Sequence, residues 1–392
     1  MFKSFWMVGF ECSSHRRRDG RRLDLIAATE HDRYAGADYA RVRRLGLRTV
    51  RDGARWHRIE RSPGRYDFSS LLPMIRAARE AGVQVIWDLC HYGWPDGLDV
   101  FRPELVDRFA DYARAVARLM AEETDEPPLW VPINEISFWS WGGGDVGYLN
   151  PCTTGRGFEL KAQLVRASLA AVDALWSVDS RARIIHCDPS INIVADAARP
   201  QDRALAEGHR QAHFQAWDMI GGTLWPQLGG DERYLDVVGV NYYPNNQWVH
   251  DGPTLPRDDP RYRPFRKILR ETWERYGRPL VVTETGDQDD ARSGWLTYVA
   301  DEVLAARREG VPVNGICLYP ILDYPGWDDD RHCRSGLWGY PGPGGKREVH
   351  LPLAEELARQ IARFRSEPEN PHFRDPDAES GPGEEENTHA AF

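Results

Sequence analysis

Two glutamates end apolar stretches of the sequence, where a charge is costly to bury without a partner or a purpose. Glu135 is the last residue of LWVPINE (129–135), and Glu284 lies in PLVVTET (279–285). One protonated and one ionised carboxyl group would supply a general acid and a nucleophile. Arg51, in LRTVRDG (47–53), offers Glu284 a structural ion pair, but an arginine also keeps a neighbouring nucleophile ionised by lowering its pKa. Each glutamate alone is therefore equally consistent with a structural and a catalytic role.

The elements that must position these residues are short apolar stretches separated by amphipathic ones. The apolar stretches are nearly continuous, as is typical of parallel strands covered on both faces. Eight strands alternating with eight helices predict an α/β fold, the TIM barrel. A flat, doubly wound sheet is the alternative, because alternation alone does not establish closure. The expected strands are 5–12, 47–53, 83–90, 129–135, 182–188, 235–243, 279–285 and 313–320, and the expected helices are 34–45, 69–81, 103–120, 157–178, 201–220, 261–276, 292–309 and 351–365.

A barrel brings the two glutamates together. Active sites of TIM barrels lie at the carboxyl ends of the strands. Glu135 ends the fourth expected strand and Glu284 the seventh, and these strand ends face each other across the barrel mouth. Catalysis therefore becomes the favoured interpretation of the pair.

Length, composition and charge narrow the class of protein. A chain of 392 residues fits one large α/β barrel. The 50 basic and 60 acidic residues give a net charge of −10, which argues against nucleic-acid and membrane-surface partners. Fifteen Trp suit core packing and also stacking on sugars. No run approaches the ~18 apolar residues of a membrane span. Six widely spaced cysteines, interpreted as reduced core thiols, and a start without a secretory pattern predict a cytoplasmic protein.

The composition changes sharply near the C-terminus. Residues 367–392 contain eight acidic residues, one Arg and almost no apolar periodicity. Such a segment cannot bury a core. We expect one barrel domain at 1–366 followed by a disordered acidic tail at 367–392.

Four segments resemble the retaining glycoside hydrolases of clan A, and family 1, the β-glucosidase family, most closely. They are Asn134-Glu135, the stretch TETG around Glu284, DVVGVNYY (236–243) and LYPILD (318–323), in the family's order and on the expected strands. The resemblance extends from Phe5 to about Trp338. It implies a TIM-barrel glycosidase that needs no metal and no organic cofactor.

The resemblance also implies roles for individual residues. Glu135 matches the acid/base and Glu284 the nucleophile. Asn134 matches the residue that binds the sugar 2-OH, Tyr243 and Arg51 match residues that hold the nucleophile, and His91 matches a contact of the −1 subsite. Tyr319 stands where the family has the Trp that floors this subsite. Further supporting or substrate-binding positions are Asn241, Trp327 and Asp328.

The sequence also departs from the family pattern. Gly326 stands where the family has a Glu that binds the distal sugar hydroxyls, with Asp328 as a possible substitute, and His15 stands near the place of a Gln. These changes leave the glycone open. They do not affect the two glutamates.

The mechanism requires different environments for the two carboxyl groups. Retaining hydrolysis places them about 5–5.5 Å apart. We expect Arg51 and Tyr243 to stabilise Glu284 as an anion, and Trp130, Phe138, Trp139 and Trp141 to raise the pKa of Glu135 by desolvation.

The sequence therefore predicts a β-glycosidase that hydrolyses or transglycosylates small β-glycosides. The alternative from another class is a carbohydrate-binding barrel that has lost turnover, and an inverting enzyme, with carboxyl groups ~6.5–9.5 Å apart, is the less favoured mechanism. The sugar, the aglycone, exo or endo action and the oligomeric state stay open.

Overall fold

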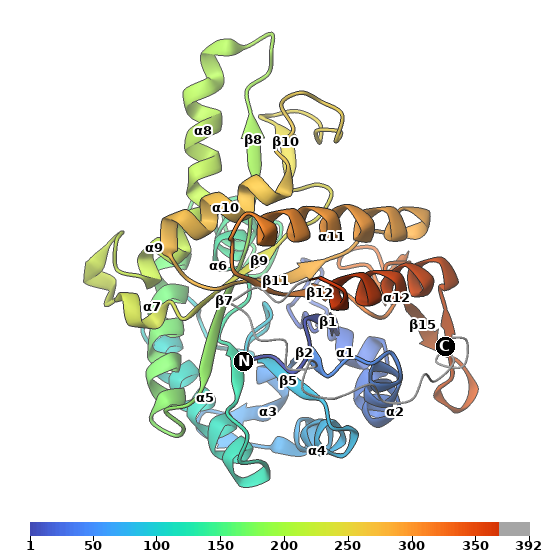
Figure 1. The fold of residues 1–392 in the computed structure, drawn as a ribbon. Coiled ribbons are helices and arrows are strands. Elements are labelled where there is room, and N and C mark those ends of the chain that lie inside the picture. The colour runs from blue at the N-terminus through green and yellow to red at the C-terminus, as the bar shows by residue number, and fades with distance from the viewer. Residues whose placement is uncertain (368–392) are drawn as a thin grey trace.

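Eight parallel strands form a closed barrel in a computed structural model, which describes residues 1–367 (Figure 1). The strands pair in the order β1-β12-β11-β9-β7-β6-β5-β2, with β1 hydrogen-bonded to β2 and β12. The predicted TIM barrel is confirmed, and the flat sheet is wrong. The barrel strands are β1 (Trp6–Gly9), β2 (Thr49–Gly53), β5 (Gln84–Asp88), β6 (Leu129–Val131), β7 (Arg183–Pro189), β9 (Val237–Asn241), β11 (Leu280–Thr285) and β12 (Val313–Leu318).

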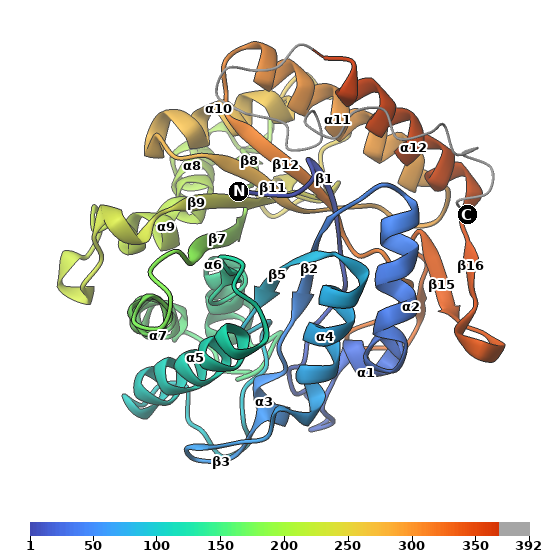
Figure 2. The ribbon, with the colours of Figure 1, turned by 60° about the horizontal axis from the view of Figure 1, so that its bottom comes forward.

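Helices surround the barrel on its outer face (Figure 2). Their apolar sides pack on the strands, whose residues are almost all buried, because strands covered on both faces need apolar neighbours on both sides. The long helices are α2 (His31–Arg44), α4 (Leu72–Ala81), α5 (Glu104–Glu123), α7 (Gly157–Trp176), α8 (Arg203–Gln211), α10 (Phe265–Tyr276), α11 (Arg292–Arg308) and α12 (Leu351–Arg365), and the short ones are α1 (Leu25–Ala28), α3 (Trp56–Ile59), α6 (Ile136–Trp139) and α9 (Gln215–Ile220).

Two expected elements differ from the structure. The strand expected at 129–135 ends at Val131, because Pro132 has no N–H to donate to a neighbouring strand. Glu135 therefore lies beyond the strand, immediately before α6. The helix expected at 201–220 is divided into α8 and α9 by a 3₁₀ turn, where the His213 ring binds the carbonyl oxygen of Arg210.

A small lobe, which the sequence did not predict, projects from the barrel (Figure 1). It contains α8 and the parallel two-stranded sheet of β8 (Asn192–Val194) and β10 (Gln247–Val249), with Gln247 opposite Asn192. The two strands come from the connections after β7 and β9. Strands of three residues in polar loops leave almost no periodicity to detect. The remaining strands, all in two-stranded sheets, are β3 (Glu60–Ser62), β4 (Arg65–Tyr66), β13 (Tyr324–Pro325), β14 (His332–Cys333), β15 (Trp338–Pro341) and β16 (Arg347–Val349).

The prediction of buried, reduced cysteines is correct for five of the six residues. All six cysteines are free, but Cys152 is exposed, so it is not a core thiol. Within residues 1–367, no helix combines the length and the apolar character needed to cross a bilayer. Glu367 pairs with Arg308, and the rest of the predicted acidic tail lies outside the described residues.

A buried charge network fastens β2 to its surroundings. His31 of α2 contacts Asp38 (2.9 Å) and Asp52 of β2 (2.8 Å), and Arg347 of β16 pairs with Asp38 (2.8 Å). Burial by itself lowers the pKa of His31, but the two carboxylates outweigh burial and raise the pKa to about 9. His31 is therefore a cation at neutral pH, and its ring stacks on Phe10 at 3.7 Å.

The raised pKa of His31 predicts a pH-dependent stability. We expect His31→Gln to destabilise the protein at pH 6 by about 3 kcal/mol, the equivalent of the shift from 6.5 to about 9. This stabilisation is complete below pH 6.5 and disappears as the pH rises through 9, so the two proteins should converge near pH 10. Urea unfolding at pH 6, 8 and 10 measures the difference, with the exposed His209→Gln as control. A difference in unfolding free energy that grows with pH would contradict the assignment of His31 as a buried cation.

Candidate active site

Glu284 lies at the carboxyl end of β11, with a donor on each oxygen. Arg51 Nη1 donates to Oε1 at 2.7 Å, and the Tyr243 hydroxyl donates to Oε2 at 2.9 Å. Both Glu284 and Arg51 are buried. The structure therefore brings together the three residues that the sequence associates with a nucleophile.

Glu135 lies opposite, in a strained backbone conformation. Its φ is +47° and that of Tyr92 is +64°, in the left-handed region that non-glycine residues rarely adopt. The Tyr92 hydroxyl donates to Glu135 Oε2, and Asn241 Nδ2 donates to Oε1 at 2.9 Å. Strain of this kind is retained where the surroundings hold a functional group in place.

A chain of hydrogen bonds joins the two glutamates. Arg51 Nη2 donates to Asn134 Oδ1 at 2.7 Å, and Asn241 Nδ2 lies 3.4 Å from the same oxygen while binding Glu135. Thr283 donates to Asn241 Oδ1 at 2.7 Å, which orients this amide. The carboxyl groups thus belong to one connected cluster at the barrel mouth.

Burial dominates the acidity of both carboxyl groups. It raises the pKa of Glu284 to about 7, where Arg51 opposes the rise and the charge of Glu135 adds to it. Burial also raises the pKa of Glu135, against the hydrogen bonds from Tyr92 and Asn241. The cation contacts Glu284 directly, so a single proton shared by the pair is more stable on Glu135. Arg51 was expected to lower the pKa of Glu284, but it does not bring this pKa below its usual range, because burial has the larger effect.

Asp88, which the sequence analysis missed, is a second carboxylate bound to Arg51. It accepts from Arg51 Nε at 3.1 Å and Nη2 at 2.8 Å, so two carboxylates share one guanidinium charge. Asp88 also binds His91 Nδ1 at 2.8 Å. The residue ends β5, so the strand-end argument that selected Glu135 would have found it as well.

His91 is held between Asp88 and the amide of Asn134. The Asn134 Oδ1 atom accepts from Arg51, so its Nδ2 faces His91 Nε2 at 3.0 Å. A proton on Nδ1 and a free lone pair on Nε2 satisfy both neighbours. Burial lowers the pKa of His91, but Asp88 and Glu11 outweigh burial and raise it. Cys12 Sγ, Asp88 and His91 also form a set with metal-ligand atoms within 4.8 Å of one another. Because Arg51 and His91 already hydrogen-bond Asp88, we assign this cluster to positioning.

Aromatic side chains form the walls of the site. Tyr319 is buried at the end of β12, parallel to the His91 ring at 6.1 Å and 5.4 Å from the Arg51 guanidinium. A Cβ atom on Gly9 would come within 2.1 Å of the Tyr319 ring, so only glycine fits beside it. Trp327 packs on Tyr92 at 5.5 Å.

The expected aromatic surroundings of Glu135 need one correction. Trp141 is 51% exposed and therefore does not enclose the carboxyl group. Trp141 lies in the π-helical turn after α6, and its ring centroid is 5.9 Å from that of Phe138. Trp130 and Trp139 are buried as expected.

The loop after β12 places Asp328 away from the glutamates. Asp328 is exposed and hydrogen-bonds Tyr148 on the rim. His15 is buried with its ring 5.2 Å from Trp327, and burial lowers its pKa to about 3, so it is neutral. Asp328 is therefore poorly placed to substitute for the glutamate that Gly326 replaces.

Glu11 is a further buried carboxylate near the site, besides Glu135, Glu284 and Asp88. Its Oε1 accepts from the Ser13 backbone at 2.9 Å and lies 3.8 Å from His91 Nε2. The sequence analysis assigned this residue no role, although it lies within the expected strand 5–12. Its position after β1, the same kind of strand end as Glu135, was the available signal.

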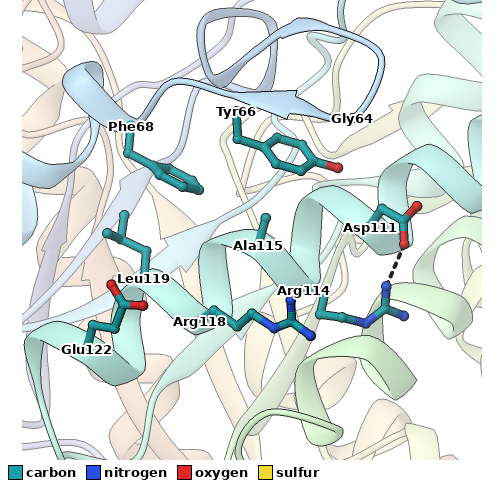
Figure 3. Close-up of a pocket in the computed structure, with 9 residues that line it drawn as sticks. All are labelled: Gly64, Tyr66, Phe68, Asp111, Arg114, Ala115, Arg118, Leu119 and Glu122. Carbon is teal, nitrogen blue, oxygen red and sulfur yellow. Dashed lines mark hydrogen bonds and ion pairs between the residues drawn. The ribbon is translucent and has the colours of Figure 1, made fainter.

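Two further depressions lie elsewhere. One separates the β3–β4 hairpin from α5, with Tyr66 and Phe68 on one side and Arg114 and Arg118 on the other (Figure 3). Another is lined by residues of the long loop after β12, including Arg334 and Lys346. Neither depression is lined by Glu135 or Glu284.

The chain is similar in fold to solved β-glucosidase structures. No protein-family model matches the sequence. The β-glucosidase of Thermotoga maritima in complex with glucoimidazole superposes with a TM-score of 0.75 over 93% of this chain and 98% of that chain, at 19% identity. The chain has the fold of a family 1 β-glucosidase. The "family 1" structure from the same organism gives a TM-score of 0.74 with the same identity and coverage.

A curated relative supports the same resemblance in sequence. The β-galactosidase of Sulfolobus acidocaldarius is 28% identical over 211 residues, which are 45% of this chain. The match spans 42% of the length of that galactosidase. The predicted similarity to family 1 is confirmed, and both similar proteins are β-glycosidases by name.

The contacts of Arg51 with two buried carboxyl groups predict that its replacement destabilises the protein in a pH-dependent way. Arg51→Met should destabilise the protein by about 3–5 kcal/mol at pH 7.5, because Asp88 and Glu284 lose their buried cation. Without it the folded-state pKa of Asp88, which Arg51 now lowers against the effect of burial, rises above its unfolded value, and the already raised pKa of Glu284 rises further. Protonation of the two carboxyl groups removes the cost of burying them as unpaired anions. The difference in unfolding free energy between the variant and the wild type should therefore shrink toward pH 5. Denaturant unfolding at both pH values tests this, and a difference independent of pH would contradict it.

Proposed function

We propose that this protein is a retaining β-glycosidase that hydrolyses or transglycosylates small β-glycosides, with Glu284 as nucleophile and Glu135 as acid/base. The observation that carries the proposal is the asymmetric support of two buried carboxyl groups in one cluster. Glu284 contacts the guanidinium of Arg51, whereas Glu135 contacts only neutral donors. The similar β-glucosidase and β-galactosidase support the substrate class.

The reaction would use the two carboxyl groups in sequence. Glu135 donates its proton to the glycosidic oxygen while the Glu284 carboxylate attacks the anomeric carbon and forms a glycosyl ester. Loss of the leaving group leaves Glu135 ionised, and it then takes a proton from the water or alcohol that cleaves the ester. Arg51 and Tyr243 hold Glu284 in position, and Asn241 and Tyr92 hold Glu135.

The other residues would bind the sugar. Asn134 and His91 present polar atoms beside the pair, Tyr319 forms the floor, and Trp327 closes one side. Asp328 would contribute at most at the rim, since its exposed carboxylate contacts Tyr148.

Two variants separate the proposed roles. Glu284→Gln should lose nearly all turnover, by at least about 10⁴-fold, while still binding sugar, because no nucleophile remains. Glu135→Ala should retain activity selectively on substrates with good leaving groups, lose the basic limb of its pH profile, and yield a β-glycosyl azide when azide is added.

The products decide the mechanism. NMR of the first-formed sugar should show the β-anomer, and an α-product would replace the retaining mechanism with an inverting one. Sugar binding without turnover of any β-glycoside by the wild-type protein would replace the enzyme with a carbohydrate-binding barrel.

The missing distal contact predicts weak selectivity for the glycone. Gly326 offers no side chain, so glucosides and galactosides should react at rates within about tenfold, ~1.4 kcal/mol in transition-state binding. The kcat/KM values of the two 4-nitrophenyl β-glycosides measure this. A preference above about a thousandfold would contradict the prediction and indicate an unassigned contact, for which Glu11→Gln is the first variant to examine.

A further inference from the structure

A cavity of about 560 Å³ lies beside the helix that follows Glu135. One wall is formed by Phe138 and Trp141, directly after the proposed acid/base. The opposite wall comes from the lobe and its connections, with His213 and Trp248. Because the general acid protonates the leaving-group oxygen, a substrate's leaving group departs on this side of the sugar.

A buried ammonium group lines this cavity without an ion-pair partner. Lys161 of α7 is 9% exposed and donates to Gln215 Oε1 at 2.8 Å. Within residues 1–367, no carboxylate oxygen lies within 4.0 Å of its nitrogen. A buried charge in this situation is costly, because solvation is lost and no opposite charge replaces it.

Two acidic residues act on Lys161 from beyond ion-pair distance: Asp145, which also lines the cavity, and Asp188. Asp145 accepts from the backbone N–H of Gly157 at 2.7 Å, at the start of α7. Asp188 accepts from the backbone N–H of Ser137 at 3.0 Å. Burial lowers the pKa of Lys161, while Asp188 and Asp145 raise it from a distance. The ammonium group is therefore available to an anion that enters the cavity.

We propose that this cavity receives the leaving group of the substrate and that Lys161 pairs there with an anionic substituent, a carboxylate or a phosphate, on an aromatic ring. Phe138, Trp141 and Trp248 provide flat apolar surfaces for the ring. Lys161 provides the single complementary charge. The inference rests on the proposed β-glycosidase activity and extends it to the class of leaving group.

The first experiment compares matched substrates. We use the 4-carboxyphenyl and 4-carbamoylphenyl β-glycosides of the glycone that the protein accepts, so that only the charge differs strongly. Lys161→Met should lower kcat/KM for the carboxyl substrate about tenfold or more and change that of the amide less than twofold. Lys161→Arg, which keeps the charge, should retain part of the preference. Lys267→Met, the same change at an exposed position, should alter neither.

The second experiment does not depend on turnover. Calorimetry should detect binding of 4-hydroxybenzoate to the wild-type protein, weaker binding of 4-hydroxybenzamide, and loss of the difference in Lys161→Met. 4-Hydroxyphenyl phosphate distinguishes phosphate from carboxylate as the preferred anion. Lysine-dependent binding without hydrolysis of any glycoside would overturn the proposed function and support the anion site.

Three outcomes would overturn the inference. They are equal losses for the carboxyl and amide substrates in Lys161→Met, no loss for either, and no preference for 4-hydroxybenzoate over the amide. A separate melting curve excludes a structural explanation. Removing an unpaired buried charge should leave the melting temperature unchanged or raise it, and a large decrease together with equal losses would assign Lys161 to the fold.

Discussion

The guanidinium group of Arg51 is the interaction on which the barrel mouth depends. It extends from β2 and contacts Asp88 at the end of β5, Glu284 and the Thr283 carbonyl of β11, and Asn134 beyond β6. A fully buried cation must be satisfied by several acceptors at once, so it constrains the positions of all these strand ends together. The geometry of the candidate site is thus also a condition for the stability of the barrel.

Sharing this cation sets the electrostatic character of the site. Arg51 binds Asp88 as well as Glu284, and burial raises the pKa of Glu284 although Arg51 opposes the rise. The two glutamates are nevertheless unequal, since one contacts a cation and the other contacts an amide and a hydroxyl group. This inequality, more than any single pKa, favours a proton on Glu135 and a charge on Glu284.

The barrel and its connections have different tasks. The strand ends position the carboxyl groups, Asn134, Asn241 and the arginine. The connections after β7 and β9 form the lobe, and together with the segment after β6 they enclose the cavity lined by Lys161. Substrate selection beyond the reacting sugar would therefore depend on segments that can change without altering the carboxyl pair.

The sequence by itself determined the eight strands, nearly all the long helices and the identity of the two glutamates. Apolar strands covered on both faces and amphipathic helices have periodicities that survive in one dimension, and a carboxylate at a strand end is visible for the same reason. Tertiary structure alone decided the partners: that Asp88 shares Arg51, that Tyr92 binds Glu135, that Asp328 lies on the rim, and that Lys161 lines a cavity with no carboxylate oxygen of residues 1–367 within 4.0 Å of its nitrogen. These facts depend on contacts between residues tens to hundreds of positions apart, and on loops whose short strands carry no periodicity, so no local pattern encodes them.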